Sequence, residues 1–134
     1  MANYYLDSSA VVKLCVAEPE TPALAELAGL ADTGLWLTCD LARTEVLRAI
    51  ARRQPEALAD AAQVLRHLAI MTLTSRLYDQ AGRLPPATLR SLDAIHVAAA
   101  LDLGSDLAAF ITYDQRLGAA ARLNGLPVIS PGAS

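Results

Sequence analysis

Four acidic residues, spread over most of the chain, stand where a fold can bring their carboxylates to one place. They are Asp7, Glu45, Asp93 and Asp114. Asp93 lies in a helical segment, 90–101, that is apolar on nearly every side, and a carboxylate is costly to bury unless a charge meets it. Carboxylates that share a pocket repel one another, raise one another's pKa values and bind divalent cations. The pattern therefore indicates a metal-dependent enzyme site.

The elements that must position these acids alternate between strand and helix along the whole chain. We expect strands at 4–6, 35–38, 70–73, 109–112 and 128–129. We expect helices at 8–17, from Pro22 to about residue 31, at 40–53, 56–67, from 75, around Asp93 and at 114–124. Asp40 and Ser75 are the expected N-caps of the helices that begin there. Strands joined by helices form a parallel sheet covered on both faces. The sequence thus predicts an α/β fold, a single α/β/α sandwich with a central parallel sheet of four to five strands.

This fold brings the acids together. Asp7 and Asp114 each follow a strand at the carboxyl edge of the sheet, where ligands bind in such folds. If the first and fourth strands are neighbours, these two carboxylates lie side by side. Asp93 in a first turn and Glu45 early in its helix face the same edge.

Each acid also has a purely structural explanation. Asp7 and Asp114 can cap the helices that follow them, and Asp93 suits a helix dipole. Glu45 can pair with Arg48 three residues on. Capping does not explain why all four would face one crevice.

Composition limits the classes of function. A chain of 134 residues forms one domain. We expect a cytoplasmic protein without a membrane span, because no apolar run reaches ~18 residues and the first residues lack a basic signal region. Cys15 and Cys39 form no CxxC motif, so zinc is not expected. The net charge of −3 gives no global field for nucleic acid, and Lys13 is the only lysine among 11 basic residues.

Three segments and the helix around Glu45 resemble one known family. They read YLDSSAVVKL at 5–14, SLDAIH at 91–96 and FITYD at 110–114. Together they are similar to PIN-domain ribonucleases, and most of all to the VapC-type toxins of bacterial toxin–antitoxin pairs. The likeness covers essentially the whole chain, as one PIN-like domain at 1–130 with a tail at 131–134 that we expect to fray.

The resemblance implies an endoribonuclease that hydrolyses RNA, with Asp7, Glu45, Asp93 and Asp114 as catalytic and metal-binding residues. Ser8 and Thr112 resemble the hydroxyl residues that support such acids. Oxygen ligands alone favour Mg²⁺, or Mn²⁺, as the ion. His96 is expected to be a core residue that takes no part, with a contact to Asp93 as the alternative.

The implied partners are RNA, a cognate antitoxin and a second copy of the chain in a homodimer. Candidate RNA contacts are the arginines expected at the rim of the crevice, namely Arg43, Arg48, Arg52, Arg53, Arg90 and Arg116. Apolar residues between 10 and 30 are numerous, and we expect them to form a groove that binds the antitoxin. The alternative is that they make ordinary core and homodimer contacts.

Other classes fit less well. A receiver-type signalling domain needs a lysine late in the chain, and none follows Lys13. A haloacid-type phosphatase needs Asp-x-Asp after the first strand, where this chain has Asp7-Ser8-Ser9. Within the PIN family, a housekeeping RNA-processing nuclease and a catalytically inactive interaction module stay open as alternatives to a toxin.

Overall fold

The computed structural model describes residues 2–30 and 34–133. Its centre is one sheet of five strands in the order β3-β2-β1-β4-β5, with every neighbouring pair parallel. The strands are β1 Asn3–Leu6, β2 Trp36–Cys39, β3 Ala69–Met71, β4 Leu107–Ile111 and β5 Val128–Ile129. The predicted parallel sheet is confirmed. The first and fourth strands are neighbours, which is the condition under which Asp7 and Asp114 are expected to lie side by side.

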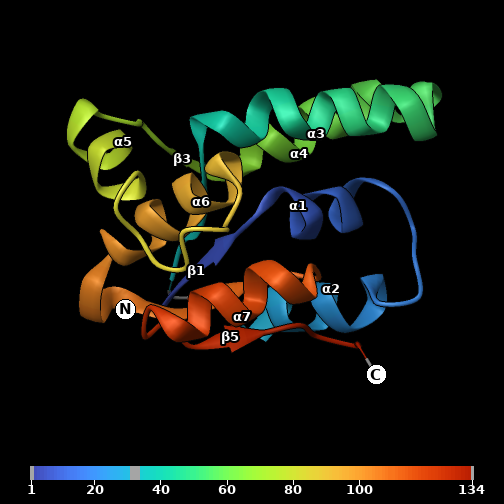
Figure 1. Cartoon of the computed structure of the whole chain (residues 1–134). Helices are drawn as coiled ribbons and strands as arrows, with labels where there is room; N and C mark the ends of the chain where they lie inside the picture. The colour runs from blue at the N-terminus through green and yellow to red at the C-terminus, as the bar shows by residue number, and fades with distance from the viewer. Residues whose placement is uncertain (1, 31–33, 134) are drawn as a thin grey trace.

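Helices cover both faces of this sheet (Figure 1). They are α1 Ser8–Cys15, α2 Thr21–Leu30, α3 Asp40–Arg53, α4 Leu58–His67, α5 Ser75–Ala81, α6 Ser91–Leu101 and α7 Gln115–Leu123, with 3-10 turns at Pro55–Ala57 and Gly104–Asp106. Side chains of a strand alternate between its faces. Leu6 and Ile111 therefore pack with α1 to α4, whereas Tyr5 and Phe110 pack with α6 and α7.

Several boundaries differ from the prediction. Cys39 belongs to β2 and stands at the N-cap of α3, so Asp40 is the first helical residue and its Oδ2 accepts instead from the Leu73 amide at 3.3 Å. Thr74, not Ser75, caps α5 by accepting from the Leu77 amide. The predicted helix end near residue 31 lies outside the described residues.

The apolar residues between 10 and 30 mostly belong to the core. Val11, Val12 and Leu24 are buried in the cluster under α1 to α4, and Leu14, Val16 and Leu27 pack against it. Leu30, at the end of α2, is 73% exposed. The prediction of an apolar groove is therefore wrong for Val11, Val12 and Leu24, because these side chains pack into the core between the sheet and its helices.

The chain end beyond β5 makes ordered contacts. Tyr113 Oη donates to the Pro131 carbonyl at 2.8 Å, and the Ala133 amide donates to the Ser130 carbonyl at 3.0 Å. These bonds connect 131–133 to residues near the ends of β4 and β5, and the expected fraying of 131–134 stays a prediction. Ser134 lies outside the described residues. No helix of the described residues is both long enough and apolar enough to cross a membrane.

Lys13, the only lysine, joins α1 to the segment that precedes α2. It is 8% exposed, and its Nζ lies 3.4 Å from Glu18 Oε2 and 3.0 Å from Glu20 Oε1. The same Nζ lies 4.7 Å from the centroid of the Tyr113 ring. A buried ammonium is tolerated only when such partners meet it.

We predict that Lys13→Met lowers the free energy of unfolding by about 1–2 kcal/mol, because Glu20 loses its ion-pair partner and Glu18 keeps only Arg53. Urea unfolding followed by circular dichroism measures this change. The matched control is Arg76→Met, which breaks the exposed pair with Asp102 and should cost under about 0.5 kcal/mol. Equal losses in the two variants would contradict the assigned role of Lys13.

Candidate active site

The site begins where β1 and β4 end side by side. Leu6 pairs with Ile111 in the sheet, and the Asp7 amide continues the ladder by donating to the Ile111 carbonyl at 3.1 Å. Asp7 and Thr112 are the next residues on their strands. The carboxyl edge therefore places an acid and a hydroxyl opposite each other.

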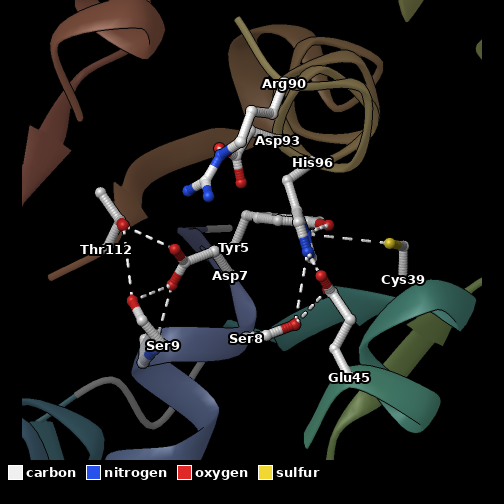
Figure 2. A network of polar contacts seen from close by, with 11 residues as sticks. Tyr5, Asp7, Ser8, Ser9, Cys39, Glu45, Arg90, Asp93, His96 and Thr112 are labelled. Carbon is white, nitrogen blue, oxygen red and sulfur yellow. Dashed lines mark hydrogen bonds and ion pairs between the residues drawn. The ribbon is translucent and has the colours of Figure 1, made fainter. Parts of the chain in front are cut away.

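Asp7 is almost fully buried, at 3% exposure, and each of its oxygens is satisfied. Oδ1 accepts from the Ser9 hydroxyl at 2.7 Å and the Ala10 amide at 3.0 Å, and Oδ2 accepts from the Thr112 hydroxyl at 2.6 Å (Figure 2). Burial raises the pKa of Asp7, although the charge of His96 and these hydrogen bonds oppose the rise. Asp7 is thus both the cap of α1 and the most strongly desolvated acid of the site.

Glu45, on α3, is held by two donors on one oxygen. Its Oε1 accepts from the Ser8 hydroxyl at 2.6 Å and lies 2.8 Å from His96 Nε2 (Figure 2). The predicted alternative of a pair with Arg48 is wrong, because Glu45 turns inward, with a side chain 25% exposed. Burial opposes its charged form, but the hydrogen bonds from His96 and Ser8 outweigh burial and lower the pKa of Glu45.

His96 is a core residue by burial, at 2% exposure, but its contacts differ from those expected. Its polar edge meets Glu45 and not Asp93, and its Nδ1 lies 2.8 Å from Tyr5 Oη. Burial disfavours the imidazolium, yet hydrogen bonds to Cys39 and Glu45 outweigh it and raise the pKa of His96 to about 10.

Asp93 and Asp114 lie on either side of the Arg90 guanidinium. Arg90 Nε is 3.3 Å from Asp93 Oδ2, and its Nη2 is 3.6 Å from Asp114 Oδ2. Asp114 uses its other oxygen to cap α7, accepting from the Leu117 amide at 3.0 Å. Asp93 lies in the first turn of α6 with its side chain 18% exposed, so it is partly and not fully buried, and Arg90 is the charge that meets it.

The four acids share one edge of the molecule without forming a single compact cluster. Figure 2 shows the Asp93 carboxylate and the Arg90 guanidinium pointing towards Asp7. Within 2–30 and 34–133, however, no three Asp, Glu, His or Cys side chains are placed closely enough to hold one ion. The raised pKa of Asp7 comes first from burial, and not from the mutual repulsion that we expected.

The candidate RNA-contacting arginines are exposed, but they do not all face the acids. Arg90 contacts two of the acids, whereas Arg53 pairs with Glu18 at 3.3 Å, away from them. Arg48 and Arg52 follow Glu45 on α3 at three and seven residues, so they extend its helical face. Arg43 lies beside Leu47 and Leu65, and Arg116 lies beside Leu89 and Leu123.

The predicted supporting hydroxyls contact the acids, Ser8 with Glu45 and Thr112 with Asp7. Sequence reasoning missed Ser9, which donates to Asp7 and accepts from the Tyr113 amide at 3.0 Å, and so joins α1 to the end of β4. The only feature of the sequence that could have indicated this role was the position of Ser9, two residues after the N-capping Asp7. The signal for His96 was its position three residues after Asp93, on the same helical face.

Comparison with known proteins agrees with this fold. Residues 4–123 match the PIN domain family. Ribonuclease VapC46 of Mycobacterium tuberculosis is 44% identical over 131 residues, which are 98% of this chain and 99% of that protein.

Two solved structures have the same fold at low sequence identity. VapC20 of Mycobacterium tuberculosis, described as a Sarcin-Ricin loop cleaving toxin, matches with a TM-score of 0.76 at 18% identity, covering 96% of this chain and 99% of that one. VapBC2 from Rickettsia felis, bound to a DNA fragment from its promoter, gives a TM-score of 0.73 at 14% identity, covering 96% and 98%.

We predict that Asp7→Asn raises the melting temperature of the protein in EDTA, by roughly 4 °C per kcal/mol of desolvation removed. Asparagine caps a helix as well as aspartate does but carries no buried charge. Because the pKa of Asp7 is raised in the folded protein, its charge lowers the free energy of unfolding at pH values above that pKa. This loss of stability disappears as the pH falls through the same pKa and Asp7 becomes protonated. The gain in melting temperature should therefore shrink as the pH falls through the raised pKa of Asp7 towards the ordinary pKa of an aspartate.

Asp114→Asn is the matched control, because it makes the same change at a more exposed helix cap, 34% against 3%. Its melting temperature should stay close to that of the wild-type protein. An Asp7→Asn protein no more stable than the wild type at high pH would contradict the assignment of Asp7 as the desolvated acid.

Proposed function

This chain belongs to the PIN-domain family, and from that premise we propose that it is a metal-dependent endoribonuclease, the toxin of a type II toxin–antitoxin pair. The observation that carries the proposal is the Asp7 carboxylate, buried at the edge where β1 and β4 end, with further acids at the same edge. A buried anion is tolerated where a cation meets it. A full-length relative at 44% identity bears the name ribonuclease, which supports the same activity.

The donor set suits a hard divalent cation. Asp7, Glu45, Asp93 and Asp114 offer carboxylate oxygens, which Mg²⁺ and Mn²⁺ prefer. These four residues would hold the ion, and their carboxylates would have to move closer together to do so, because no three of them are placed around one point in the described residues. When bound, such an ion polarises a phosphate group and lowers the pKa of water.

The chain's own residues have distinct roles in this proposal. Ser9 and Thr112 hold Asp7, so that its carboxylate keeps one orientation. Glu45, with its lowered pKa, stays ionised near neutral pH and can accept a hydrogen bond from the attacking water. Arg90 places a planar fork of donors beside Asp93 and Asp114, a geometry that suits an RNA phosphate.

The other partners follow from the family. VapBC complexes have been solved with the fold of this chain, and this supports our proposal of an antitoxin protein as the cognate partner. A homodimer and a cytoplasmic location stay predictions.

RNA hydrolysis should require Mg²⁺ or Mn²⁺ and stop in EDTA. Asp7→Ala should lower the rate by at least about 100-fold, because it removes a ligand and opens the buried edge. Gel analysis of bacterial total RNA measures both effects. Asp102→Asn, an acid of the exposed pair with Arg76, should cleave at the wild-type rate. Full activity in EDTA would rule out the metal-dependent mechanism.

Expression of the wild-type chain alone should arrest bacterial growth, whereas Asp7→Asn should not. Co-expression of the protein encoded beside it should restore growth, if that protein is the antitoxin. Viable counts after induction measure both results. A soluble wild-type protein that cleaves RNA but leaves growth unchanged would overturn the toxin assignment and favour an RNA-processing nuclease.

A further inference from the structure

His96 lies between three elements of the fold and shares α6 with Asp93, one of the four acids. It is carried by α6, its Nδ1 faces Tyr5 Oη of β1 at 2.8 Å, and its Nε2 faces Glu45 Oε1 of α3 at 2.8 Å. The Tyr5 and His96 rings also meet edge to face, with centroids 5.9 Å apart at 68°. With 2% exposure, the imidazole has no room to leave this position.

The identity of the partners decides where the proton lies. An ionised carboxylate only accepts hydrogen bonds, so His96 Nε2 must donate to Glu45 Oε1. The Tyr5 hydroxyl can donate to an unprotonated Nδ1 or accept from a protonated one. In both cases the Nε2–H points at Glu45, so the contact does not depend on the charge of the ring.

Ser8 completes the arrangement. Its hydroxyl donates to the same Oε1 at 2.6 Å and lies 3.3 Å from His96 Nε2, so Oε1 receives two donors from two different elements. Glu45 Oε2 makes no hydrogen bond within the described part of the chain. Two fixed donors on one oxygen restrict the rotation of the carboxylate and leave the second oxygen available to an ion or water.

We propose that His96 is a positioning residue that, with Tyr5 behind it, holds Glu45 in the orientation the metal site needs. This inference rests on the proposed function and deepens it. A core histidine that only fills space would make no contribution beyond its volume. A positioning histidine contributes through its Nε2–H, so a variant that keeps a donor at that place should work, and one of similar volume without a donor should not.

The test compares His96→Gln, which keeps an N–H donor, with His96→Met, which keeps the volume but has no donor. For His96→Met we expect Mn²⁺ affinity, measured by electron paramagnetic resonance, to fall about 10-fold or more. The maximal rate on bacterial total RNA should fall about 10- to 100-fold, with little change in the RNA concentration for half-maximal rate. His96→Gln should recover most of both. Tyr5→Phe should give a smaller loss of the same kind.

A double-mutant cycle makes the test specific. In a Glu45→Gln background, His96→Met should cause no further loss of Mn²⁺ affinity, because the group that it positions is already changed. Thermal melts show whether each variant is folded at the assay temperature. Equal losses in His96→Gln and His96→Met, or additive losses in the cycle, would overturn the inference.

The two proposals can fail separately. If the wild-type protein cleaves RNA and His96→Met matches it in rate and Mn²⁺ affinity, the inference fails and the function stands. If the Mn²⁺ affinities follow the expected order but the wild-type protein cleaves no RNA, the inference stands and the ribonuclease function fails.

Discussion

The burial of one carboxylate, that of Asp7, constrains the whole carboxyl edge of the sheet. Its negative charge requires donors, and these come from Ser9 and the first turn of α1 on one side and from Thr112 after β4 on the other. Because these groups belong to different elements, satisfying Asp7 also locks α1 against the end of β4. Ser9 adds to this lock by accepting from the Tyr113 amide. The stability of this edge and the chemistry of the site therefore depend on the same bonds.

The structural and functional explanations of the acids are compatible, because a carboxylate has two oxygens. Asp7 caps α1 through Oδ1 and meets Thr112 through Oδ2. Asp114 caps α7 through Oδ1 and faces Arg90 through Oδ2. Glu45 follows the same principle, with its two donors on Oε1. At each position one oxygen fixes the side chain and the other faces the opening or a residue beside it.

The pattern of residues along the chain predicted those features that depend on residues close together in the sequence. The alternation of strands and helices was enough to predict a parallel sheet with Asp7 and Asp114 at its carboxyl edge. That β1 lies beside β4 was a condition of the prediction, which the structure meets. The contact between His96 and Glu45 joins residues 51 positions apart, and it depends on how α3 and α6 lie across the sheet. The hydrophobic periodicity of a segment shows which of its faces is buried, but not how two distant helices pack against each other. The same holds for Asp40, which accepts a hydrogen bond from the Leu73 amide, 33 residues further on, and does not cap α3.

The placement of Lys13 has a consequence for covalent modification. It is the only ε-amino group in the sequence, and in the fold it is surrounded by Glu18, Glu20 and the Tyr113 ring. An acyl donor or a protein-conjugating enzyme would need to reach this amine, which burial among these groups prevents. The folded chain thus has no side-chain amine open to acetylation or isopeptide tagging, and such marking would have to wait until α1 separates from the segment before α2.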